Sequence, residues 1–182
     1  VPRFVAWMNV EARRLGLHET HFVTPHGLDR PGQVSSARDV VRLLRAALAN
    51  PTIRRIASTE HVEIDGRDLD TTDDLLASFP ALAAGKTGHT DDAGWAEVAE
   101  ARRGGVSIYA AVLGDPSRAQ RNDDLKALLT WALGRYRRGL AIDPTRVYAV
   151  ARTAYGRPAV RLVARRAVFR EQLTGRPLVE QV

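Results

Sequence analysis

Two segments near the start of the chain carry apolar residues at helical spacing. The first spans residues 4–17, with Gly16 as a stop signal; its apolar positions are Phe4, Val5, Met8, Ala12 and Leu15. The second follows the polar pair Ser35-Ser36, which offers an N-cap, and closes at Asn50-Pro51; its apolar positions are Val40, Leu43, Leu44 and Leu48. A turn-rich stretch over residues 20–29 separates the two expected helices.

The middle of the chain changes to the pattern of strands. Residues 61–67 alternate up to the turn dipeptide Asp65-Gly66, as a short hairpin does, and residues 72–76 suggest a short capped helical turn. Residues 95–101 and 106–113 are rich in apolar and β-branched side chains on either side of an Arg-Arg-Gly-Gly turn. With the stretch around Lys86 they predict a three-stranded antiparallel sheet.

A third amphipathic segment follows the sheet, and a different composition follows that segment. Residues 120–136 predict a helix that covers the sheet with Leu125, Leu128, Leu129, Ala132 and Leu133. Asp143-Pro144 indicates a boundary, and residues 147–151 and 160–164 are expected to be strands. The pattern therefore predicts an α+β fold, with an antiparallel sheet and flanking helices over residues 1–140 and a small β-rich segment over residues 141–182.

Charge is divided unevenly along the chain. Of the 182 residues 45% are hydrophobic and 26% charged, which is enough for one core, and there is no cysteine. Residues 1–100 have a net charge of −4 and residues 101–182 a net charge of +10. Such a basic tail suits an anionic wall polymer or membrane surface. Because the tail has few aromatic residues among its arginines and no recognisable binding module, nucleic acid is not an expected partner.

The strongest chemical signal is the tripeptide Lys86-Thr87-Gly88, one of three short motifs of serine acyl-transfer sites. The chain has only two lysines, Lys86 and Lys126. The companion motifs, a Ser-x-x-Lys nucleophile and a Ser-x-Asn element, do not occur, because no serine has a lysine three positions after it. Since the chain also begins at Val1 rather than Met, we expect it to be the carboxy-terminal part of an enzyme, with no catalytic nucleophile of its own.

Two other site types fit these residues less well. A phosphate-binding loop ending at Gly85-Lys86-Thr87 needs a glycine five residues earlier, where Pro80 stands. His18 and His21 are three residues apart, but they lie on a polar loop without the glutamate placement of a zinc-protease helix. We therefore expect neither a metal nor a cofactor.

The chain resembles the second half of a D-alanyl-D-alanine carboxypeptidase, a low-molecular-weight penicillin-binding protein of the serine peptidase type. The resemblance runs from about Phe4 to Tyr136, and its motifs appear in order as Phe4 to Asn9, Leu15 to Leu17, Thr20 to Phe22, Pro25 to Asp29, Ser35 to Asp39, Gly85 to Gly94, Val112 to Gly114, and Arg121 before Leu128-Leu129. Asp73 departs from the family, which often has Asn there in a Thr-Asn-x-Leu-Leu stretch.

The resemblance implies a β-lactamase/transpeptidase-like fold and an extracytoplasmic protein acting on peptidoglycan stem peptides that end in D-Ala-D-Ala, with β-lactams as inhibitors. It implies that Lys86 and Thr87 hold the terminal carboxylate of the substrate. Gly88 lets the ligand approach the strand, and the backbone N–H of His89 completes an oxyanion hole.

Two further functions stay open at this point. One is a β-lactamase or esterase relative of the same fold, and the other is a noncatalytic wall-binding module, which the basic tail would suit. Sequence upstream of Val1 would discriminate them, because Ser-x-x-Lys and Ser-x-Asn motifs there favour the enzyme.

Overall fold

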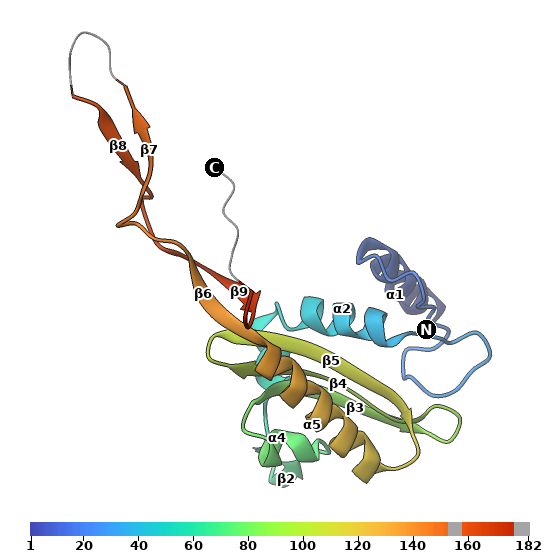
Figure 1. Ribbon diagram of the computed structural model, residues 1–182. Coiled ribbons are helices and arrows are strands. Elements are labelled where there is room, and N and C mark those ends of the chain that lie inside the picture. The colour runs from blue at the N-terminus through green and yellow to red at the C-terminus, as the bar shows by residue number, and fades with distance from the viewer. Residues whose placement is uncertain (153–157, 177–182) are drawn as a thin grey trace.

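A three-stranded antiparallel sheet forms the centre of the protein (Figure 1). The computed structural model describes residues 1–152 and 158–176. The strands β3 (Leu82–Thr90), β4 (Gly94–Arg103) and β5 (Val106–Asp115) lie in the order β3-β4-β5. The tight connection between β4 and β5 uses Gly104 and Gly105, whose φ angles of 58° and 77° suit glycine in a two-residue hairpin turn. The predicted sheet is confirmed.

One face of this sheet is covered by α5 (Arg118–Arg135), with the short helix α4 (Asp74–Ser78) beside it. Leu125 and Leu129 are completely buried against Ala99 and Ala101, whose small side chains let the helix approach β4 closely. The full cluster of buried residues is Leu75, Leu76, Leu82, Ala99, Ala101, Val106, Ala110, Leu125, Leu129 and Leu133. This is the larger core, and it forms where the amphipathic pattern predicts it, except that Leu128, which was expected on the covered face of α5, is 38% exposed.

The other face of the sheet packs against α2 (Ala37–Ala47) and α3 (Pro51–Ala57). Leu44 and Leu48 are buried there against Ala84 of β3. The predicted stop at Asn50-Pro51 does follow the end of α2, but the same dipeptide also starts α3, which the sequence analysis missed. The Asn50 side chain accepts hydrogen bonds from the N–H groups of Thr52 and Ile53, and proline is well tolerated at the first helical position.

Helix α1 (Pro2–Arg14) lies beside α2 and is joined to it by a long loop (Figure 1). The Asn9 side chain holds this loop by accepting from the N–H and donating to the carbonyl of Phe22, at 2.8 and 2.7 Å. Asp39, which is 1% exposed, accepts from the Glu19 N–H and the Thr20 hydroxyl, both at 2.8 Å. The outer face of α1 stays uncovered, with Phe4, Trp7 and Val10 exposed.

The predicted hairpin near residue 61 is confirmed as β1 (His61–Ile64) paired with β2 (Arg67–Asp70). Asp65 and Gly66 both have positive φ at its turn. All eight strand residues are exposed, so this hairpin contributes little to the core.

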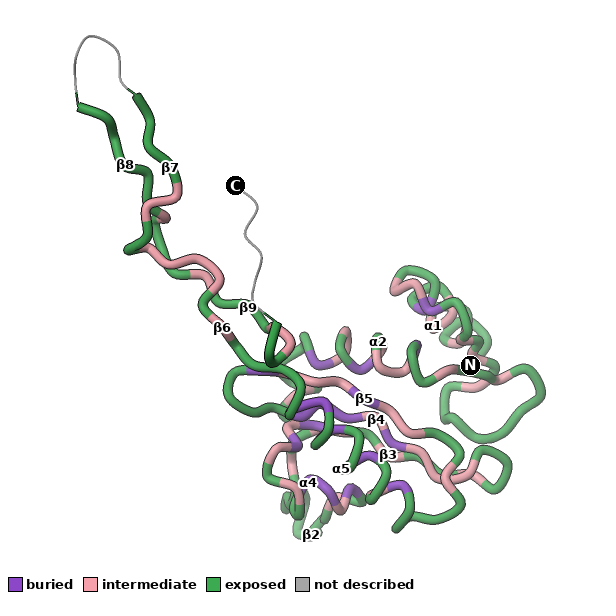
Figure 2. Tube along the Cα trace, in the orientation of Figure 1, coloured by how far each residue is buried: buried purple, intermediate pink, exposed green. Residues whose placement is uncertain are grey.

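The carboxy-terminal part forms an elongated arm of paired strands that projects from the sheet (Figure 1) and is largely exposed (Figure 2). β6 (Tyr136–Ile142) pairs with β9 (Val168–Leu173), and β7 (Val147–Ala151) pairs with β8 (Val160–Val163). The expected strands at 147–151 and 160–164 are thus confirmed within one residue. The expectation of a helix through Tyr136 was wrong by one residue, because Tyr136 begins β6.

Strands β6 and β9 were not predicted. A division of the chain at residues 140 and 141 stays a proposal; β6 runs through that position and belongs with the arm. Residues 153–157 and 177–182 of the proposed second part lie outside the described residues. Within the described ranges, no helix combines the length and the apolar character needed to cross a membrane.

Candidate active site

Lys86, Thr87, Gly88 and His89 lie together on β3, an edge strand of the sheet. Lys86 is opposite Val98 and Thr87 is opposite Glu97 on β4. Because residues directly opposite each other in an antiparallel pair share a face, Lys86 points to the side of α2 and Thr87 to the side of α4 and α5. The Lys86 ammonium is exposed and donates a hydrogen bond to the Thr87 carbonyl.

Two grooves meet at Lys86 and Thr87. The first is mainly apolar, has a volume of about 630 Å³, and is walled by α2 and α3 through residues such as Leu43 and Ile56. The second has a volume of about 890 Å³ and continues along Gly88 and His89 to the loop around His26. A ligand lying along the edge of β3 would therefore contact the motif residues from either groove.

Three contacts fix the motif strand against its neighbours. The Thr87 hydroxyl is 3.0 Å from the Thr72 hydroxyl, and the Thr90 hydroxyl donates to Asp29 Oδ1 at 2.8 Å. The imidazole of His89 packs on the Trp95 indole of β4 with ring centroids 4.2 Å apart. Of these partners, Thr72 and Trp95 were not singled out by sequence reasoning, and their contacts with the motif follow only from the fold.

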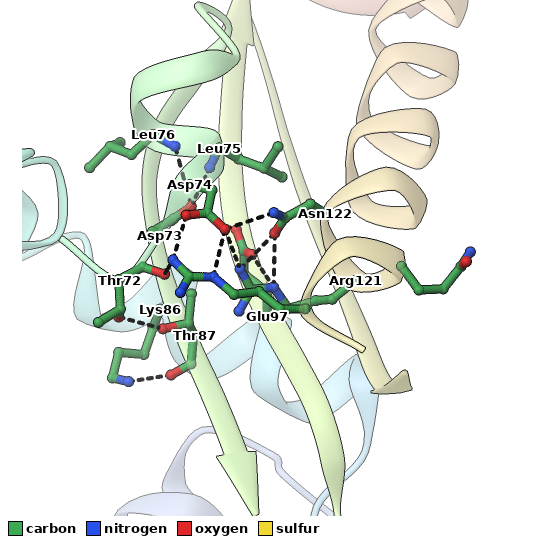
Figure 3. Close-up of polar contacts among 12 residues, drawn as sticks. Thr72, Asp73, Asp74, Leu75, Leu76, Lys86, Thr87, Glu97, Arg121 and Asn122 are labelled. Carbon is green, nitrogen blue, oxygen red and sulfur yellow. Dashed lines mark hydrogen bonds and ion pairs between the residues drawn. The ribbon is translucent and has the colours of Figure 1, made fainter. Parts of the chain in front are cut away.

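A cluster of buried charged residues lies on the face of the sheet that carries Thr87, between the sheet and the helices α4 and α5 (Figure 3). Asp73, Glu97 and Arg121 are 5%, 2% and 1% exposed, and Arg121 Nε is 3.0 Å from Glu97 Oε2. Burial, and then the charge of Asp73, raise the pKa of Glu97 to about 8. Burial also raises the pKa of Asp73, despite the hydrogen bonds that it accepts from the N–H groups of α4.

Another buried carboxylate, Glu100, lies on the opposite face of β4 from Glu97. It accepts hydrogen bonds from Tyr109 and Arg54, both at 2.6 Å, and from Arg102 at 2.9 Å. Burial alone would raise the pKa of Glu100, but these three donors outweigh it and hold that pKa below its usual range. This cluster joins α3 to the sheet and leaves Glu100 fully ionised near neutral pH.

Among the described residues, no serine beside the motif has a basic side chain placed to activate it as a nucleophile. Ser35 lines the second groove, but its hydroxyl is 2.9 Å from the Thr20 hydroxyl, and no serine in residues 1–152 or 158–176 is hydrogen-bonded to a lysine or histidine side chain. Over the same ranges, no group of three or more potential metal ligands is found. His18 and His21 accordingly do not form such a group.

The sequence matches known proteins over most of its length. Residues 1–117 match the family model described as D-alanyl-D-alanine carboxypeptidase. The chain is 38% identical to D-alanyl-D-alanine carboxypeptidase DacD of Salmonella typhimurium over 132 residues, which cover 71% of this chain and 34% of that protein. It is 39% identical to DacB2 of Mycobacterium tuberculosis over 115 residues, covering 60% and 40%. The chain thus spans about a third of the length of the curated relatives it matches.

Solved structures agree with these relatives. Penicillin binding protein 5 from Haemophilus influenzae superposes with a TM-score of 0.75 at 30% identity, covering 96% of this chain and 52% of that one. The Streptomyces K15 DD-transpeptidase superposes with a TM-score of 0.69 at 27% identity, covering 71% and 53%. The fold is therefore the α+β fold of these enzymes. On its sequence and its fold, the chain belongs to the D-alanyl-D-alanine carboxypeptidase family.

Proposed function

We propose that this chain supplies the substrate-binding strand of a serine-type D-Ala-D-Ala carboxypeptidase that acts on peptidoglycan stem peptides outside the cytoplasm. The observation that carries the proposal is the position of Lys86, Thr87 and Gly88 on an edge strand between two grooves. The residues fit an anionic peptide end: Lys86 supplies an exposed positive charge and Thr87 a hydroxyl donor. A Cβ added at Gly88 would meet no atom within 4 Å, so the strand is open to a ligand there.

In the proposed reaction, a serine in an upstream part of a longer protein attacks the carbonyl between the two terminal D-alanines. The C–N bond breaks, the last D-alanine leaves with a proton on its nitrogen, and an ester to the serine forms. Water then hydrolyses that ester. Lys86 and Thr87 hold the carboxylate of the leaving D-alanine, while the backbone N–H of His89 is one of the two oxyanion donors. β-lactams, as analogues of the same peptide end, acylate the same serine.

A labelled penicillin tests this assignment. A longer protein that carries the proposed upstream serine is expected to form a covalent adduct whose mass is one penicillin, and residues 1–182 alone are expected to form none. Mass spectrometry of both proteins, followed by peptide mapping, locates the adduct. A penicilloyl group on Ser35 or on any other serine of residues 1–182 would overturn the placement of the nucleophile.

The arm supports a second, separable function as a contact with an anionic wall polymer or membrane surface. Residues 136–152 and 158–176 contain nine arginines and two acidic residues. Arg161, Arg165 and Arg166 have no acidic partner among the described residues, and Val150 and Val163 are more than half exposed beside them. Charge of this density attracts polyanions in a salt-dependent way.

Co-sedimentation of the chain with isolated cell walls or with vesicles containing anionic lipid tests this second function. Binding is expected to fall when Arg161, Arg165 and Arg166 are all replaced by Gln, and to fall with added salt. Arg13, Arg14 and Arg30 all replaced by Gln, which removes the same number of charges outside the arm, serve as the matched control. Equal binding by both sets of variants would overturn the proposal that the arm binds the anionic surface.

A further inference from the structure

The buried cluster of Asp73, Glu97 and Arg121 contains more acidic groups than basic ones. Two carboxyl groups, Asp73 and Glu97, are buried next to a single buried cation, Arg121. The neighbouring Asp74 is paired mainly with Arg118, which donates to it twice, and the Asn122 amide donates to it at 2.8 Å; Arg121 Nη2 is also 3.9 Å from Asp74 Oδ2. With both carboxyls ionised, one negative charge would remain buried without a counter-ion, which is costly in a protein interior.

The hydrogen bonds of the cluster are unbalanced in the same way. Asp73 Oδ1 accepts from the N–H groups of Leu75 and Leu76 at 3.0 and 3.2 Å and so caps α4. Asp73 Oδ2 and Glu97 Oε1 are buried and have no hydrogen-bond donor in the described part of the chain, whereas Glu97 Oε2 faces Arg121 Nε at 3.0 Å in an ion pair. One proton held between the two carboxyl groups would make one of these two oxygens a donor and the other its acceptor, so that neither stays unsatisfied.

The two carboxyls are placed to share such a proton. They lie within hydrogen-bonding reach of each other, on the face of the sheet that carries Thr87, which is directly opposite Glu97. Asp73 Oδ2 also packs on the backbone of β3, because a Cβ added at Gly85 would lie closer to it than 3.0 Å. The residue before Asp73, Thr72, bonds the Thr87 hydroxyl at 3.0 Å.

We propose that Asp73 and Glu97 hold one proton between them, and that this carboxyl–carboxylate hydrogen bond positions the segment carrying Thr72 against the strand carrying Thr87. Glu97 donates and Asp73 accepts, while Arg121 balances the one remaining negative charge. Both are positioning residues, because they act on Thr87 through Thr72 and the backbone. The pair itself is independent of the proposed function, whereas its effect on a ligand rests on that function.

The charged groups around Asp73 and Glu97 are consistent with one proton being shared by the two carboxyls. From α4 the pair faces Asp74, and from α5 it faces Arg121, with Arg118 one step further away beyond Asp74. The residues of β3 beside it, Gly85 and Thr87, carry no charge. At the far end of β5, Asp115 interacts with Arg121 and with Asp124 of α5. The additional carboxylates around Arg121 increase the negative potential and favour the protonated pair.

Two isosteric variants make the pair testable. Asp73→Asn keeps an oxygen to cap α4 and presents an amide donor to Glu97, so Glu97 no longer needs a proton. Glu97→Gln keeps a donor toward Asp73 and has no proton to lose. Glu63→Gln, in the exposed hairpin β1–β2, is the matched control.

The experiment is a ¹³C NMR titration of the side-chain carboxyls in the full chain from pH 4 to pH 10, with the Thr87 amide followed in parallel. In the wild type we expect the Glu97 carbon to titrate near pH 8 and the Thr87 amide to shift with the same midpoint. In Asp73→Asn the Glu97 midpoint should move down toward 4.5, and in Glu97→Gln the Thr87 amide should lose its shift near pH 8. Glu63→Gln should reproduce the wild type.

A wild-type Glu97 that titrates at its ordinary value would overturn the shared proton, and a Thr87 amide that ignores the titration would overturn the positioning role. The effect on the ligand is measured separately, as the pH profile of penicillin acylation of the longer protein. A loss of acylation above pH 8 that Glu97→Gln abolishes is expected. If the NMR result holds and the longer protein is not acylated at any pH, the proposed function fails and the proton-sharing pair stands.

Discussion

Gly85 and Gly88 lie three residues apart on the same strand. From the structure we expect Gly85→Ala to lower the free energy of unfolding and Gly88→Ala to leave it unchanged or slightly higher. Neither has a positive φ, so alanine is compatible with the backbone at both positions. At Gly85 the new methyl group would lie closer than 3.0 Å to Asp73 Oδ2, the oxygen of a short, buried and capping side chain. At Gly88 the new methyl group would meet nothing within 4 Å.

The magnitudes separate the two variants clearly. In Gly85→Ala, moving Asp73 weakens the cap of α4, which is worth about 1 kcal/mol. Overpacking adds about 1–3 kcal/mol. In both variants, replacing glycine by alanine lowers the entropy of the unfolded chain, which stabilises the folded state by about 0.4–1 kcal/mol. We therefore expect Gly85→Ala to lose about 2 kcal/mol of unfolding free energy, and Gly88→Ala to be unchanged or slightly more stable.

Urea unfolding of the 182-residue chain, followed by tryptophan fluorescence, measures the difference. With an m-value of about 2 kcal/mol/M, the two midpoints should differ by about 1 M or more. Binding should show the opposite order in the longer protein, because Gly88→Ala puts a methyl group on the open edge and slows penicillin acylation. Equal midpoints for the two variants would refute the packing of Asp73 on Gly85 and the account of the cluster built on it.

Two further predictions concern the core on either face of the sheet. Leu129→Ala should cost about 2–5 kcal/mol of unfolding free energy, measured in urea, because Leu129 is completely buried between α5 and β4 and leaves a cavity; a loss below 1 kcal/mol would contradict that packing. Glu100 has a lowered folded pKa, so its contribution to stability is present above pH 4.5 and is lost as the pH falls through the folded pKa. The stability difference between wild type and Glu100→Gln should therefore shrink in acid, and a difference that grows in acid would show that Glu100 is not held ionised by Arg54 and Tyr109.

The elements predicted well from the sequence are those with strong local signals. The central sheet has strand-forming residues on both sides of a Gly-Gly turn, and α5 has an uninterrupted apolar face. Ser36 was expected as an N-cap and accepts a hydrogen bond from the Asp39 N–H. Helix α3 was missed because Asn50-Pro51 was interpreted only as a stop signal, although Asn is also a good N-cap and Pro a good first helical residue.

The remaining differences come from contacts between residues that are distant in the chain. Strand β6 is stabilised by pairing with β9, about 30 residues later, and no local alternation at Arg137-Arg138-Gly139 indicates it. Likewise the motif at Lys86 was visible as a short pattern, whereas Asp73, Glu97 and Arg121 come from α4, β4 and α5 and meet only in the folded chain. The departure from the family at Asp73 and the place of Arg121 among the motifs of the resemblance are the two sequence signals that could have pointed to the cluster.

Lys86→Ala compared with His89→Ala in the longer protein tests the substrate-binding role of β3 most directly. Lys86 is exposed and its side chain donates a hydrogen bond to the neighbouring Thr87 carbonyl of the same strand, so its loss should leave the fold intact while removing the charge for the terminal carboxylate. His89→Ala keeps the backbone N–H and loses only the packing on Trp95, worth about 1 kcal/mol. The measurement is the rate of acylation by labelled penicillin: we predict a fall of at least tenfold for Lys86→Ala and a much smaller one for His89→Ala, whereas the reverse order would contradict β3 as the substrate-binding strand.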